Sequence, residues 1–146
     1  MFFGLPEFEL KKLQIIQNSA ARLVSRIKKS EHITPILKRL HWLPVTKRLE
    51  FKIACLVYKV IHGVAPAYLG ELLEIQSSTR TLRSTTSGVV NLQQPIGKTK
   101  YYGDRSFTIY APRLWNRLPT TVRSADTSEN FKTFLKTHLF KEYYVV

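Results

Sequence analysis

The chain has 146 residues, which is about the length of one domain. Hydrophobic residues make up 44% and aromatic residues 12% of it, too much for a disordered basic tail. It carries 23 lysines and arginines against 10 acidic residues, so the formal net charge of +13 favours polyanionic partners. Aspartate occurs only at Asp104 and Asp126, so the clustered carboxylates with which nucleic-acid enzymes hold Mg²⁺ are missing.

Other signatures of chemistry are also missing. Cys55 is the only cysteine and lies in an apolar run, which indicates a buried, inert thiol. The four histidines are dispersed, and there is no glycine-rich phosphate loop or nucleophile elbow. We therefore expect no catalytic residue, no metal site and no cofactor, and do not expect the chain itself to be an enzyme. No run approaches the roughly 20 apolar residues of a membrane span, and we expect neither a membrane partner nor a secretion signal.

Residues 7–73 are predicted to form a helical part. Its first helix carries an apolar stripe at helical spacing that is expected to face the core: Leu13, Ile16, Ala20, Leu23, Val24 and Ile27. In this interpretation Arg22, Arg26 and Lys29 project from the opposite side, so that the helix is apolar in front and basic behind.

Two further helices follow in this part. Thr34-Pro35 is typical of a helix start, with threonine as N-cap, and predicts a short helix to residue 40. Apolar residues cover most of the circumference of a longer helix over residues 45–62, which predicts a central place in the core. Its one polar stripe carries Arg48, Lys52 and Lys59, and Gly63 is expected to cap its end. A last short helix is predicted over residues 66–73.

Residues 76–104 differ in character. The segment is polar and basic, and it predicts a loop or an extended arm, with short strands at 89–90 and 99–102.

Residues 105–141 are predicted to be helical again. One helix is expected over 113–118, with a proline before it at position 112. Asp126 and Glu129 resemble a capping box for a last helix to about residue 140, whose buried face is expected to hold Phe131, Phe134, Leu135 and Leu139. The three parts together predict one compact, mainly α domain over residues 1–146, with a basic irregular insertion at 76–104.

The basic residues follow rows along helix faces and along the central segment. Such rows suit regularly spaced phosphates. They also occur where charges merely solvate an outward face, although solvation would work equally well with balanced signs. The candidates for phosphate contact are Arg22, Arg26, Lys29, Arg48, Lys52, Arg80, Arg83 and Arg105.

Several motifs occur in a fixed order along the chain. They are Leu13-Gln14-Ile15-Ile16-Gln17-Asn18-Ser19-Ala20-Ala21-Arg22, His32-Ile33-Thr34-Pro35, Leu40-His41-Trp42-Leu43-Pro44-Val45, Gly63-Val64-Ala65-Pro66-Ala67-Tyr68-Leu69, Gly103-Asp104-Arg105-Ser106-Phe107, Ala111-Pro112-Arg113-Leu114-Trp115-Asn116-Arg117-Leu118-Pro119 and Leu135-Lys136-Thr137-His138-Leu139-Phe140. In this order and spacing the chain resembles, from about residue 4 to 141, the C-terminal part of the reverse transcriptase polyprotein of LINE-type (non-LTR), jockey-like retrotransposons.

The resemblance implies a segment that follows the polymerase proper and acts in the nucleus on element RNA and target DNA. The parent family is an RNA-directed DNA polymerase, but its catalytic aspartates are absent from this chain. We therefore expect a non-catalytic accessory segment that holds template RNA or target DNA, mostly by backbone contacts. Two alternatives stay open: a helical module that packs on the polymerase, and a truncated element copy without a function of its own.

Overall fold

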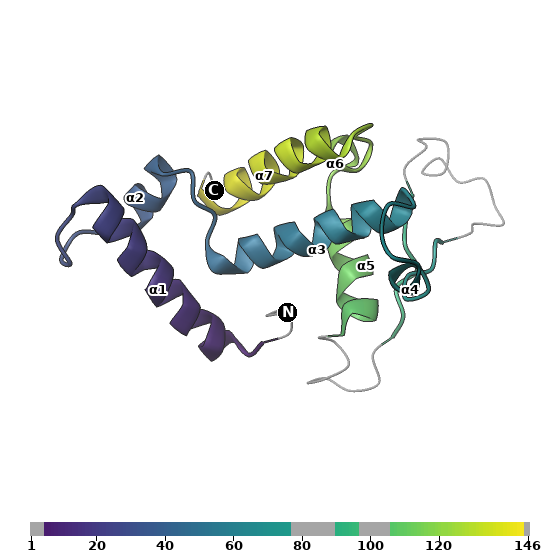
Figure 1. Ribbon diagram of the computed structural model, residues 1–146, viewed down its shortest axis with the longest axis horizontal. Helices are drawn as coiled ribbons and strands as arrows, with labels where there is room; N and C mark the ends of the chain where they lie inside the picture. Colours follow the sequence, from purple (N-terminus) through teal and green to yellow (C-terminus); the bar gives the residue numbers. More distant parts are fainter. Residues whose placement is uncertain (1–4, 77–89, 97–105, 145–146) are drawn as a thin grey trace.

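Seven helices make up most of the described chain in the computed structural model, which describes residues 5–76, 90–96 and 106–144 (Figure 1). They are α1 (Glu7–Ser25), α2 (Thr34–Arg39), α3 (Val45–Ile61), α4 (Ala67–Gly70), α5 (Phe107–Arg117), α6 (Thr120–Arg123) and α7 (Ser128–Tyr144). The only β-pairing within these ranges is an isolated antiparallel bridge between Ile75 and Leu92. The mainly α, single-domain prediction is confirmed.

Helices α3, α5 and α7 form the main core, named here the α3–α5–α7 core. Figure 1 shows α7 running alongside α3, while α5 crosses α3 towards its C-terminal end. The ring of Phe131 lies between those of Tyr58 and Trp115, with centroids 4.4 and 5.7 Å away. The buried polar atoms of both partners are satisfied, since Tyr58 Oη donates to the Ala125 carbonyl at 3.0 Å and Trp115 Nε1 donates to the Val90 carbonyl at 2.9 Å.

An ion-pair network ties the three helices at the edge of this core. Lys47 Nζ donates to Glu50 Oε2 at 3.0 Å and to Glu142 Oε2 at 2.7 Å, and Arg117 approaches the same two carboxylates. Burial alone would lower the pKa of Lys47, but its hydrogen bonds with Glu142 and Glu50 raise it above the ordinary value. Burial likewise opposes ionisation of Glu142, yet the hydrogen bond from Lys47 holds its pKa below the ordinary value. The network therefore favours the charged form of both groups.

Helices α1 and α2 form a second region, named here the α1–α2 lobe. Its small core consists of Ala21, Ile36 and Leu37, with Trp42 and Tyr144 packed against it. Tyr144 Oη donates to the Trp42 carbonyl at 2.7 Å and so attaches the end of α7 to this lobe.

The buried face of α1 is not the predicted one. Gln17 and Ala21 are its buried residues, whereas Leu23 is 80% exposed and Ile16 is 65% exposed. Two amides explain this orientation, because they satisfy backbone groups at the start of α3. Gln17 Nε2 donates to the Leu43 carbonyl at 2.8 Å, and Gln14 Oε1 accepts from the Val45 N–H at 2.8 Å, a donor that α3 itself leaves unpaired. The expectation that the apolar stripe faces the core is wrong for Ile16, Ala20, Leu23 and Val24, which are exposed, whereas Ile27 packs against the core of the lobe.

Several predicted boundaries also change. The N-cap of α2 is Ile33, and Thr34 is already helical. The hydroxyl of Thr127, not Asp126, caps α7 by accepting from the Asn130 N–H at 3.2 Å. Phe134 is 48% exposed and does not belong to the buried face of α7.

Helix α5 is continuous where a shorter helix was predicted. It runs from Phe107 to Arg117 with Pro112 inside it, so the Thr108 carbonyl loses a backbone donor. Pro112 is less than 2% exposed. Its burial in the core offsets the lost hydrogen bond, an effect that the local sequence does not reveal.

Candidate nucleic-acid interface

Three of the predicted phosphate-binding residues come together in the α1–α2 lobe. Arg22, Arg26 and Lys29 line one surface hollow of about 650 Å³. Asn18 and Ser19 line it as well, and none of the residues that line it carries a carboxylate. The lining therefore presents only positive charge to an anion.

The end of α1 gives the hollow its shape. Arg26 lies in the left-handed region with φ 52°, and the chain closes the helix through two backbone bonds: Arg26 N–H to the Leu23 carbonyl at 3.3 Å and Ile27 N–H to the Arg22 carbonyl at 3.2 Å. Glycine is the usual residue at this position, because side chains cost energy there. The turn sends Lys29 back towards the face of α1 that carries Arg22.

Arg22 is held by the same turn. Its Nη1 donates to the Lys28 carbonyl at 2.8 Å, so the guanidinium is fixed beside the hollow without losing its charge to an acidic partner. The turn is closed from the other side by Glu31, which accepts from the Lys28 N–H at 3.2 Å. The carboxylate of Glu31 is thus engaged with backbone and not with Arg22.

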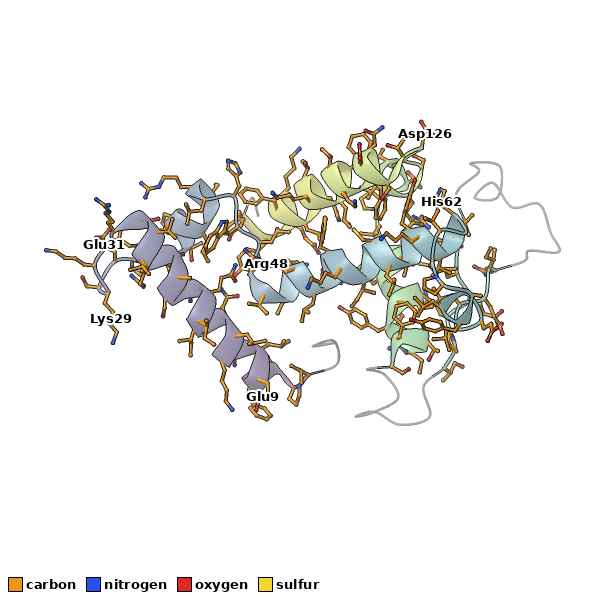
Figure 2. All side chains as sticks on the ribbon, viewed as in Figure 1. Glu9, Lys29, Glu31, Arg48, His62 and Asp126 are labelled. Atoms are coloured by element: carbon orange, nitrogen blue, oxygen red, sulfur yellow. The ribbon has the colours of Figure 1, made fainter. Side chains whose placement is uncertain are left out.

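Arg48 and Lys52 belong to a second basic group on α3. Arg48 Nε donates to the Leu43 carbonyl at 3.0 Å, and its guanidinium lies 5.5 Å from the centroid of the Trp42 ring. Lys52 is exposed one turn further along the helix. Figure 2 shows Lys29 at the outer end of the α1–α2 turn and Arg48 at the beginning of α3, so the structure does not unite the two groups.

Lys132 of α7 is a further basic residue near α3, and it was not among the residues predicted from the sequence. Burial raises the pKa of the Cys55 thiol to about 11, and the positive charges of Lys132 and Lys59 oppose the rise. Lys132 of α7 and Lys59 of α3 thus both lie near Cys55. Only the packing of α7 along α3 reveals this, since Lys132 lies 73 positions beyond Lys59 in the chain.

The ion pairs among the described residues involve other basic residues than the predicted ones. Lys11 and Lys12 pair with Glu7 and Glu9 in α1, and the other ion pairs described belong to the network around Lys47. None of the five located candidates forms an ion pair with another described residue: Arg22, Arg26, Lys29, Arg48 and Lys52. Within the described part of the chain, no carboxylate therefore competes with an external anion for these charges.

Three candidates cannot be placed. Arg80, Arg83 and Arg105 lie outside the described residues, as does Asp104. Arg123 is a basic residue with a structural role, because its Nη1 donates to Asn91 Oδ1 at 2.7 Å. Burial lowers the pKa of its guanidinium. Among the residues described, no group of histidine, cysteine or acidic side chains is arranged to hold a metal ion.

The chain matches no protein-family model, no curated protein and no solved structure. None of the helices described is long and apolar enough to span a membrane.

Proposed function

We propose that this chain is a non-catalytic accessory segment that binds RNA or DNA through its phosphate backbone. The observation that carries the proposal is the set of five located bases that form no ion pair within the described structure. Each phosphate neutralised by such a base releases condensed counterions, which supplies most of the free energy of sequence-independent binding. The hollow at the end of α1 and the basic residues of α3 and α7 offer two places for these contacts.

The motif resemblance supports a setting for this binding. A segment that follows a reverse transcriptase in the nucleus would hold template RNA or the primed target DNA beside the polymerase. The surface described here suits that task, because its basic side chains recognise the charge and spacing of phosphates and not the edges of nucleobases. We expect no polymerase or nuclease activity from the chain itself.

A charge-matched pair of variants tests the nucleic-acid proposal. Arg26→Gly with Lys29→Ala removes two bases of the hollow, and Gly suits the backbone at position 26. Lys11→Ala with Lys12→Ala removes two bases of the same helix that already pair with Glu7 and Glu9. We expect fluorescence anisotropy with labelled RNA, single-stranded DNA and duplex DNA to show a several-fold weaker affinity for the first variant than for the second.

Equal losses in the two variants would mean that the hollow has no special role and only net charge counts. Absence of binding by the unmodified chain at low salt would contradict the proposal itself. That result, together with no protein partner, is the outcome expected of a truncated element copy without function.

A second candidate function is supported by a different observation. Four large aliphatic residues of α1 are mostly exposed: Ile15, Ile16, Leu23 and Val24. Single exposed apolar residues are common at protein surfaces, whereas several on one helix are typical of an interaction site. A helical module that packs on a polymerase or another protein would cover these residues. Dye binding by ANS and concentration-dependent association, both reduced by Leu23→Ser, are its expected signs.

A further inference from the structure

The outer side of α1 combines apolar and basic side chains within one hollow. Ile15, Leu23 and Ile27 line the same hollow as the three bases. Ile15 is 64% exposed although it is a large aliphatic residue. Ile16 and Val24 extend the exposed apolar surface along the helix. Covering apolar surface of this kind with a complementary surface lowers the free energy.

The charges of α1 are divided along its length. Glu7 and Glu9 lie in the first turn, where they pair with Lys11 and Lys12. Figure 2 shows Glu9 at the opposite end of the helix from Lys29. The charged residues that line the hollow are therefore all basic, and the nearby Glu31 is engaged with the Lys28 N–H. An occupant that matches this lining brings negative charge as well as apolar side chains.

We infer that the outer side of α1 docks an acidic amphipathic helix of a partner protein. Such a helix would place aliphatic side chains at positions i, i+3, i+4 and i+7 on Ile15, Leu23 and Ile27, and its flanking carboxylates beside Arg22, Arg26 and Lys29. The part of α1 that lines the hollow begins at Ile15 and ends at Ser25, roughly 16 Å, which offers contact to about three turns of a partner helix. The inference rests on the second candidate function, a helical module that packs on another protein, and specifies the kind of partner.

Two other occupants would match this surface less completely, because each leaves either the charges or the aliphatic side chains without a partner. A second copy of this chain would bring two surfaces of a protein with net charge +13 together, with the same three bases on both sides. Nucleic acid would satisfy the bases, but the residues around the hollow include no aromatic ring for base stacking, and the aliphatic side chains would gain nothing from phosphates. An acidic amphipathic helix matches both kinds of side chain.

The test uses a designed peptide of about 18 residues, with leucines along one helical face and glutamates elsewhere. The control peptide has the same composition in a shuffled order that spreads the leucines around the helix. With the fluorescein-labelled peptides and the full chain, we expect anisotropy to show about tenfold tighter binding of the amphipathic peptide. Ile15→Ser and Leu23→Ser should each weaken its binding about five- to tenfold, as for residues central to an interface.

Ile96→Ser is the matched control, since Ile96 is 92% exposed and does not line the hollow. It should leave peptide affinity unchanged. Ile15→Ser and Leu23→Ser should leave affinity for RNA and DNA unchanged, so the inference and the nucleic-acid proposal succeed or fail separately.

Three outcomes overturn the inference. Equal binding of the two peptides would show attraction by charge alone. Binding to phosphatidylserine vesicles, sensitive to Leu23→Ser and without a preference between the peptides, would assign the face to a lipid surface. Self-association that is lost in Leu23→Ser, again without such a preference, would assign it to a second copy.

Discussion

The α3–α5–α7 core and the α1–α2 lobe are held together by different kinds of contact. In the core, stacked rings and buried aliphatic residues surround Phe131, which is completely buried. In the lobe, the amides of Gln14 and Gln17 fix α1 to the turn before α3, while Leu23 and Val24 face the solvent. The first arrangement gains stability from buried apolar area. The second leaves apolar area unused by the fold, which makes it available to a partner.

The largest expected effect concerns the core. Phe131→Ala removes a completely buried ring, and it should lower the free energy of unfolding by about 3–5 kcal/mol. Leu23→Ala in the lobe should change it by less than about 0.5 kcal/mol, because the side chain is already in water. Urea titrations followed by circular dichroism measure both. Comparable losses in the two variants would show that the lobe's apolar stripe is buried after all.

The second prediction reverses the usual ranking of polar and apolar residues within α1. Gln14→Ala leaves the Val45 N–H without its acceptor and should cost about 1–2 kcal/mol. It should therefore destabilise the protein more than Leu23→Ala does, although alanine favours helix formation. The same urea titrations apply, with Gln93→Ala as control, since that side chain is exposed. A neutral Gln14→Ala would contradict the role given to the amide.

These two predictions mark the limit of what the sequence reveals about the fold. The central place of the helix over 45–62 could be predicted, because apolar residues cover most of its circumference. In α1 the apolar stripe predicted the wrong buried face. The buried face is set by hydrogen bonds of Gln14 and Gln17 to partners that lie 31 and 26 positions further along the chain. Hydrophobic periodicity carries no information about such distant hydrogen bonds.

The candidate site shows the same division. Arg22, Arg26 and Lys29 were predicted as one group, and the three residues do line one hollow. Their predicted place opposite the apolar stripe is wrong, because Leu23 and Ile27 of that stripe line the same hollow. The sequence could not show that they share a hollow with Ile15 and Leu23, since the hollow depends on the left-handed backbone at Arg26. A glycine at position 26 would have signalled the turn, whereas an arginine gives no such signal.

The third prediction uses that strained position. Arg26→Gly should raise the free energy of unfolding by about 1 kcal/mol, because glycine adopts φ near 52° without the steric cost that other residues meet. Ala20→Gly is the control and should lower it by about 1 kcal/mol, since residue 20 is exposed and lies inside the helix. Thermal denaturation of both variants shows whether each substitution raises or lowers the free energy of unfolding. A loss of stability in Arg26→Gly would mean that the arginine side chain itself supports the turn.

The smallest expected effect is a pH dependence at the edge of the core. The pKa of Glu142 is lower in the folded than in the unfolded chain, so its contribution to stability is present above the ordinary pKa and is lost as the pH falls through the folded value. Stability should therefore decrease on acidification from about pH 5. Glu142→Gln should make this decrease shallower in melts recorded between pH 3 and 7, whereas Glu129→Gln, at an exposed site, should not. If the dependence of stability on pH is the same in Glu142→Gln as in the unmodified chain, the ion pair with Lys47 does not contribute to the loss of stability in acid.

The most direct test of nucleic-acid binding through the bases of the α1 hollow is the salt dependence of affinity. For the unmodified chain, the logarithm of the association constant should fall linearly with the logarithm of salt concentration, by about 0.9 per phosphate contact on duplex DNA and about 0.7 on single strands. Arg26→Gly with Lys29→Ala should reduce this slope by about 1.4 to 1.8, the equivalent of two contacts. A slope identical to that of the unmodified chain would contradict the phosphate contacts assigned to Arg26 and Lys29.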